Sequence, residues 1–159
     1  MLNFKNINVN PKNRKTGDCS TRALCAVLNI PYEDALKLQY EESLKCYYDP
    51  TSKQVMERVL SKFGYVKMKQ PRKGDGSKYL VKELDQLTTE EERQNGILVT
   101  IANHHTCVYK DSIIDIWNCG NKSIGNYYVC KKKSSYDKGN LHSLFDSVKP
   151  DCNMSYRIL

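Results

Sequence analysis

The chain has 159 residues, of which 40% are hydrophobic and 27% are charged, and its formal net charge is +7 at pH 7. A chain of this length can bury a sizeable core, and we expect one domain over residues 1–159. No apolar run approaches the roughly 20 residues that a membrane span requires, which argues against a transmembrane protein.

The N-terminal sequence and the cysteine content both suggest a reducing compartment. Residues 1–6 contain neither an apolar stretch nor a cleavage site, so we expect a cytoplasmic protein. The odd number of cysteines, seven, argues against a closed set of disulfides, and no Cys-x-x-Cys pair is present. We therefore expect mostly reduced cysteines, no structural metal and no cofactor.

The first half of the chain predicts helices after a polar approach. Residues 8–15 contain Pro11 and predict an extended loop. Asp18 is a suitable N-cap for a helix over residues 19–29, in which Cys19 begins an apolar stripe at helical spacing. Asn29-Ile30-Pro31 would end this helix. The nucleophile candidate described below is thus the first residue of a predicted central helix.

Two more helices are predicted before the middle of the chain. The first runs from residue 32 or 33 to about residue 44, with inward-facing Ala35, Leu36, Leu38 and Leu44. The second opens at Pro50-Thr51-Ser52, repeats apolar residues on one side and ends at Gly64.

The second half of the chain predicts mainly strands. A short strand over residues 65–68 is followed by a loop over 69–77, an apolar pattern over 79–87 and a capped helical turn over 89–92. Runs rich in β-branched and aromatic residues then predict strands over 97–102, 106–110, 113–117, 126–130 and 155–159. Helices followed by an antiparallel sheet predict an α+β fold.

Cys19 is the candidate nucleophile. It follows Gly17-Asp18 at the predicted first turn of a helix, where unpaired N–H groups and the helix dipole favour a thiolate. The alternative is a structural role, because free cysteines are among the most buried residues. Cys25, Cys46, Cys130 and Cys152 have no comparable setting, and we interpret them as packing residues.

A base and an orienting acid are available in the predicted strands. His104 and His105 open one strand and point to opposite faces, so one of them at most can meet Cys19. Asp115, one strand later, is placed to accept the imidazole N–H, with Asn118 as the alternative orienter. Trp117 is most simply a core residue, although it is also placed to shield the pair from water.

These motifs together resemble the papain-like cysteine peptidase superfamily, and most closely its small bacterial and phage-borne members related to peptidases that trim double-glycine leaders. The matching elements are Asp18-Cys19, the spacing from His105 to Asp111, and Asp115-Ile116-Trp117. The resemblance covers under half of the chain. It implies a papain-like fold, with the nucleophile at the start of a central helix packed on the sheet, and a bacterial host cell if the chain is phage-encoded.

The resemblance also assigns roles. The six-residue step to Asp111 selects His105 over His104 as the base, which gives the triad Cys19, His105 and Asp115. Asn13 stands where papain-like enzymes usually place an oxyanion-binding Gln, six residues before the nucleophile, and it is shorter by one methylene. The implied activity is thiol-dependent hydrolysis of a peptide or isopeptide bond in a protein or peptide substrate, with transglutaminase-like acyl transfer or deamidation as variants of the same chemistry.

Two alternatives from other classes stay open. Basic residues cluster over 67–78 and 131–133, so a catalytically weak papain-like protein could instead bind and inhibit an acidic host protein or nucleic acid. Alternatively, His104 or His105 could bind a metal with Cys107 and Cys119, although their spacing matches no standard zinc module.

Overall fold

The computed structural model describes residues 1–15 and 17–131, which form an α+β fold around one mixed sheet. Its helices are α1 (Cys19–Leu28), α2 (Tyr32–Cys46), α3 (Lys53–Lys62) and α4 (Glu90–Gln94), with a 3₁₀ helix η1 (Val81–Gln86). Its strands are β1 (Asn3–Asn6), β2 (Tyr65–Met68), β3 (Ile97–Ile101), β4 (His104–Tyr109), β5 (Ser112–Asp115) and β6 (Tyr127–Cys130). No helix in this part of the chain is both long and apolar enough to cross a membrane.

The sheet has six strands in the order β1-β5-β4-β3-β6-β2. Neighbouring strands are antiparallel except for β1, which pairs with β5 in parallel and aligns Asn3 with Ser112. The strand predicted over 65–68 is present as β2 at one edge, but the prediction of an antiparallel sheet is wrong at the other edge, where the unpredicted β1 is parallel to β5. Strand β1 was missed because it is short and polar, with Phe4 as its single apolar residue.

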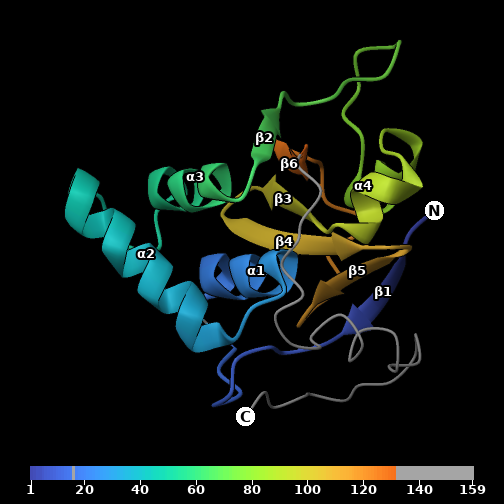
Figure 1. Cartoon of the computed structure of the whole chain (residues 1–159). Helices are drawn as coiled ribbons and strands as arrows, with labels where there is room; N and C mark the ends of the chain where they lie inside the picture. Colours follow the sequence, from blue (N-terminus) through green and yellow to red (C-terminus); the bar gives the residue numbers. More distant parts are fainter. Residues whose placement is uncertain (16, 132–159) are drawn as a thin grey trace.

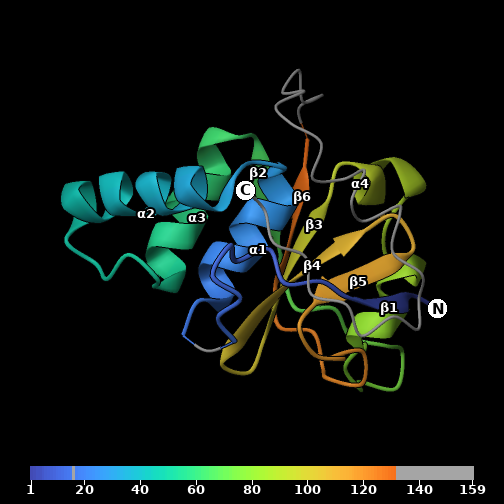
Figure 2. The same ribbon diagram turned by 90° about the horizontal axis from the view of Figure 1, so that it is seen from below.

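Helices α1, α2 and α3 cover one face of the sheet, whereas η1 and α4 lie on the other side (Figures 1 and 2). The first core joins α1 and α3 to inward residues of the central strands, such as Leu24 from α1 and Cys107 from β4. The second core joins η1 to the opposite side chains of the same strands, such as Leu84 from η1 and Val108 from β4. Alternation along each strand thus supplies both cores.

Most helix boundaries agree with the sequence. The Ser52 hydroxyl accepts a hydrogen bond from the Val55 N–H at the start of α3, and Thr89 begins α4 with a capping box. Helix α2 keeps part of its predicted face, since Ala35 is buried and Leu38 packs against the first core, but Leu44 is 74% exposed and Gln39 and Glu42 are buried instead. Because Gln39 and Glu42 complete this face with polar side chains, the apolar pattern alone could not identify all of it. The predicted strand over 155–159 and Cys152 lie outside the described residues.

Candidate active site

Cys19 is the first residue of α1 and is half-buried. Asp18 precedes the helix as predicted, but its side chain does not cap it. Instead, the Asp18 carboxylate accepts hydrogen bonds from Asn10 Nδ2 at 2.7 Å and from the Tyr32 hydroxyl at 3.0 Å, and it forms an ion pair with Arg22. Since these partners occupy the carboxylate, it does not compete with the thiol for the N–H groups of the first turn.

A buried amide fixes the first turn of α1 next to Cys19. The Thr21 hydroxyl donates to Gln39 Oε1 at 2.7 Å, and Gln39 Nε2 donates to the Ser20 hydroxyl at 3.1 Å. Gln39 is fully buried in α2, so its amide can satisfy both hydroxyls away from water. The polar face of α2 therefore sets the orientation of the turn that carries the nucleophile.

His104 lies between the thiol and a carboxylate. Its Nε2 is 2.7 Å from Asp115 Oδ2, and its ring also makes a side-chain hydrogen bond with Cys19. Because Asp115 occupies Nε2, the other ring nitrogen, Nδ1, is left for the thiol. Asp115 is 5% exposed, and its second oxygen accepts the Ile116 N–H at 2.7 Å. These bonds hold the carboxylate, and through it the tautomer and direction of the ring.

The electrostatics of the site favour a thiolate–imidazolium pair. Burial opposes ionisation of Cys19, but the His104 side chain and the backbone N–H groups of His105 and Ser20 outweigh it and lower the thiol pKa. Burial likewise opposes a charge on His104, but hydrogen bonds to Asp115 and Cys19 raise the pKa of His104 to about 9. At neutral pH the ring therefore holds a proton while the sulfur loses one readily.

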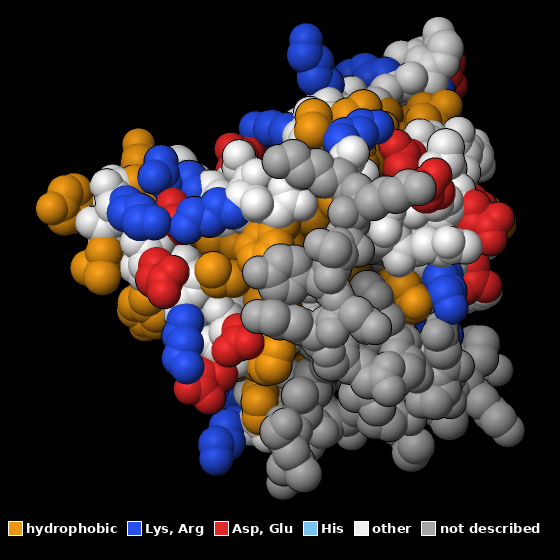
Figure 3. Space-filling model, in the orientation of Figure 1, with side chains coloured by type: hydrophobic (Ala, Val, Ile, Leu, Met, Phe, Trp, Pro, Cys, Tyr) orange, Lys and Arg blue, Asp and Glu red, His pale blue; other side chains and the backbone are white. Residues whose placement is uncertain are grey.

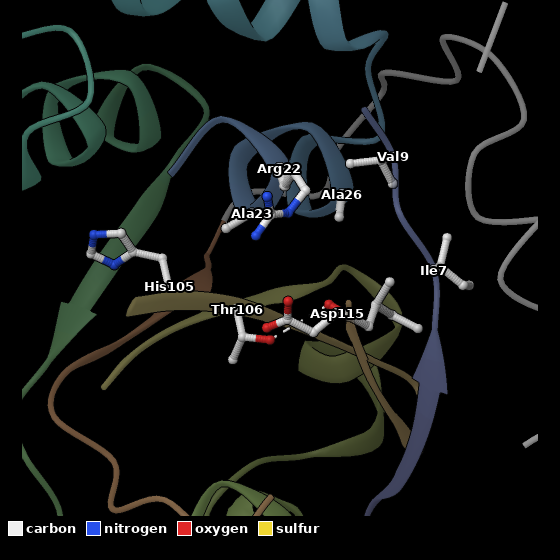
Figure 4. A pocket seen from close by; sticks show the side chains of 9 residues that line it. Ile7, Val9, Arg22, Ala23, Ala26, His105, Thr106 and Asp115 are labelled. Carbon is white, nitrogen blue, oxygen red and sulfur yellow. Dashed lines mark hydrogen bonds between the residues drawn. The ribbon is translucent and has the colours of Figure 1, made fainter. Parts of the chain in front are cut away.

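The predicted choice of His105 as the base is wrong in geometry. Its ring points away from Asp115 (Figure 4), and its Nδ1 is buried with no hydrogen-bond partner among the described residues. Burial and the positive charges of His104 and Lys53 lower the pKa of His105 to about 4. What His105 contributes is its backbone N–H, which donates to the Cys19 thiol.

The alternation of strand residues could have identified His104. Tyr109 pairs with Ser112, so a two-residue turn at Lys110-Asp111 joins β4 to β5. Any two-residue turn here places Asp115 on the same face as the even-numbered residues of β4, and hence with His104. The six-residue spacing from His105 to Asp111 is a distance along the chain, and it carries no information about which face of the strand each residue occupies.

Three other expected residues have different surroundings. Asn13 has a left-handed backbone (φ 59°), and its buried Oδ1 has no hydrogen-bond partner among the described residues. Asn118 is exposed and accepts the Gly120 N–H at 3.0 Å, so Asp115 and not Asn118 orients the histidine. Trp117 is 38% exposed and packs on the His104 ring at 5.1 Å between centroids, so its interpretation as a core residue is wrong.

The two alternatives, a metal site and a basic surface that binds an acidic partner, depend on other groups of residues. Within residues 1–15 and 17–131, no group of three or more His, Cys, Asp or Glu side chains could hold a metal ion. The basic cluster over 67–78 is partly neutralised, because Lys67 pairs with Glu57 at 2.8 Å and Lys73 with Glu83 at 2.9 Å. Figure 3 shows basic and acidic side chains side by side on the face that it presents.

Comparison with known proteins finds no matching family model, no matching curated protein and no matching solved structure.

Proposed function

We propose that the protein is a cysteine-dependent hydrolase of the papain-like type that cleaves a peptide or isopeptide bond. The observation that carries this proposal is the placement of His104 between the Cys19 thiol and the buried Asp115 carboxylate. A nucleophile, a base within hydrogen-bonding reach and a third group that orients the base are the parts that such chemistry requires.

In the first half of the reaction, His104 holds the proton of Cys19 and the thiolate attacks the carbonyl carbon of the substrate. The backbone N–H of Cys19 lies at the start of α1, where it can donate to the oxyanion that develops. As the C–N bond breaks, His104 transfers its proton to the departing nitrogen, and an acyl thioester remains on Cys19.

In the second half, His104 takes a proton from water, and the resulting hydroxide equivalent attacks the thioester. The acid product leaves, the sulfur departs as a thiolate and His104 keeps the proton that it took from water, which restores the starting pair. Asp115 stays ionised beside the ring throughout and stabilises the imidazolium each time it forms. An amine in place of water would give acyl transfer with the same residues.

Intact-mass measurement after brief exposure to iodoacetamide at pH 6 tests the nucleophile. We expect one fast adduct on the wild type, which is lost in Cys19→Ala because the lowered pKa of this thiol makes it reactive at that pH. Cys46→Ala is the matched control, since Cys46 is also half-buried but lies at the far end of α2. It should keep the fast adduct. Equal labelling of Cys19→Ala and wild type would contradict the proposal.

Turnover is tested with the same variants. Wild-type protein incubated with a mixture of peptides should form a hydroxylamine-sensitive acyl adduct and release shortened peptides, and Cys19→Ala should do neither. Adding a primary amine separates the two outcomes of the thioester, because an acyltransferase would attach the amine to the peptide instead of releasing an acid.

A further inference from the structure

Arg22 is a buried cation beside the nucleophile. It lies one helical turn after Asp18 in α1, is 7% exposed, and forms an ion pair with the Asp18 carboxylate. Asp18 is in turn the residue directly before Cys19 and is also held by Asn10 and Tyr32. A buried guanidinium is costly unless its charge is balanced, and Asp18 supplies that balance on one side.

Arg22 also faces the acid of the candidate triad. Arg22, Thr106 and Asp115 line a cavity of about 10 Å³, whose remaining walls are mostly apolar. In Figure 4 the Arg22 guanidinium and the Asp115 carboxylate point toward one another from α1 and β5. Such a cavity holds roughly one water molecule, so the two charged groups have little between them to screen their attraction.

The groups around Asp115 differ in how long their charge persists. His104 from β4 carries a proton only in part of the catalytic cycle, and the neighbouring thiols of Cys107 and Cys119 have pKa values that are raised by burial. Arg22 from α1 carries a permanent charge, and the attraction of Asp115 helps to preserve it against the lowering effect of burial on its pKa. Asp18 is the ion-pair partner of that guanidinium.

We propose that Arg22 is a positioning residue that holds Asp115 toward His104 and couples the nucleophile's helix to the strand that carries the acid. This inference rests on the proposed function. When His104 gives up its proton to the departing nitrogen, the buried carboxylate loses its charged partner on β4. The guanidinium then still faces it, so that the carboxylate keeps its place and the ring keeps its direction.

The test compares the pH dependence of Cys19 alkylation in three variants: Arg22→Met, Asp18→Asn, and both together. In Arg22→Met we expect a rate at pH 6 about tenfold below that of the wild type, because the thiolate–imidazolium pair forms less completely. Asp18→Asn should not fall below the wild type, because it removes a negative charge from beside the sulfur. The double variant removes both members of the Arg22–Asp18 ion pair. It therefore leaves no unpaired buried charge that could make the protein misfold.

The double variant decides the question. If Arg22 acts on Asp115, the double variant should stay at least about fivefold slower than the wild type at pH 6 and match it within about twofold at pH 10, where the thiol ionises unaided. Recovery of the wild-type rate at pH 6 would overturn the inference and leave Arg22 as a partner of Asp18 alone.

Two controls separate the outcomes. Glu42→Gln removes a buried charge in α2, away from the site, and should reduce stability without moving the alkylation profile. A wild-type thiol that reacts at pH 6 no faster than an ordinary cysteine would refute the proposed function itself. A reactive wild-type thiol with an unaffected Arg22→Met profile would refute only the role of Arg22.

Discussion

At the scale of single residues, the choice between two adjacent histidines decides what the site can do. His104 is linked to both Cys19 and Asp115, whereas His105 turns its ring away and keeps it neutral at physiological pH. The His105 backbone N–H nevertheless donates to the thiol. The side chain of His104 and the backbone of His105 therefore act on the same sulfur. This is possible because side chains alternate between the two faces of a sheet, whereas backbone N–H groups lie in its plane.

This difference predicts opposite results for the two histidine variants. His104→Gln should raise the pKa of Cys19 and slow its alkylation at pH 6 by about tenfold or more, because the main favourable partner of the thiolate is lost. His105→Gln should stay within about twofold of the wild type, since its backbone donor remains. Alkylation rates from pH 5 to 10 measure both, and equal profiles would contradict the assignment.

The pH dependence of turnover follows from the same pair. The pKa of Cys19 is lowered, so the rise of kcat/KM with pH should occur below the pKa of an ordinary thiol. The pKa of His104 is raised to about 9, and the imidazolium that protonates the departing nitrogen is lost above that value, so kcat/KM should fall again near pH 9.

At the scale of elements, α2 shows how a polar helix face can direct a site. Gln39 holds the first turn of α1, and one turn later Glu42 is 2% exposed beneath Lys45 at 3.0 Å, Arg58 at 2.9 Å and Lys62. Long cationic side chains cover this carboxylate, so it is shielded from water without being deep in hydrocarbon. The hydrogen bond with Lys62 is the main reason that the pKa of Glu42 falls to about 2.

Replacing this carboxylate should measure its contribution. We expect Glu42→Gln to lower the free energy of unfolding at pH 7 by about 1–2 kcal/mol, a value reduced because all three cations are partly exposed. The folded-state pKa is depressed, so the contribution is present above about pH 4.5 and is lost as the pH falls toward 2. Urea unfolding at pH 7 and pH 3 checks this, and a difference that persists unchanged at pH 3 would contradict it.

At the scale of the whole molecule, one sheet supports two cores. Leu24 from α1 and Leu84 from η1 are both fully buried, on opposite faces of the same central strands. Gly96, with a left-handed φ of 81°, brings β3 close to α1, since a Cβ there would lie 3.1 Å from the Val27 carbonyl oxygen. Helix α1 therefore packs closely against β3, the neighbour of strand β4, and β4 carries His104.

Because the cores share their strands, they should unfold together. Leu24→Ala and Leu84→Ala should each cost about 2–5 kcal/mol of stability and should shift the same single transition in calorimetry and in circular dichroism. Separate transitions for the two variants would show that the two faces of the sheet are independent, contrary to the expectation of one domain.

Much of the fold was accessible from local patterns. The helical stripe after Asp18, the capping signals at Ser52 and Thr89, and the β-rich runs between Gly96 and Cys130 all identified elements correctly, because each depends on neighbours within a few residues. The polar face of α2 and the parallel pairing of β1 were not accessible in this way. Gln39 and Asn3 gain their surroundings from residues far along the chain.

The sequence by itself determined that a cysteine begins a helix and that two histidines and an aspartate follow in neighbouring strands, since backbone propensity and side-chain periodicity are local. Only the tertiary structure decided which ring meets the sulfur, that Trp117 lies over that ring, and that Arg22 faces Asp115. The reason is geometric: the register of β4 against β5, and the packing of α1 on the sheet, bring together side chains whose separation in sequence carries no signal of contact.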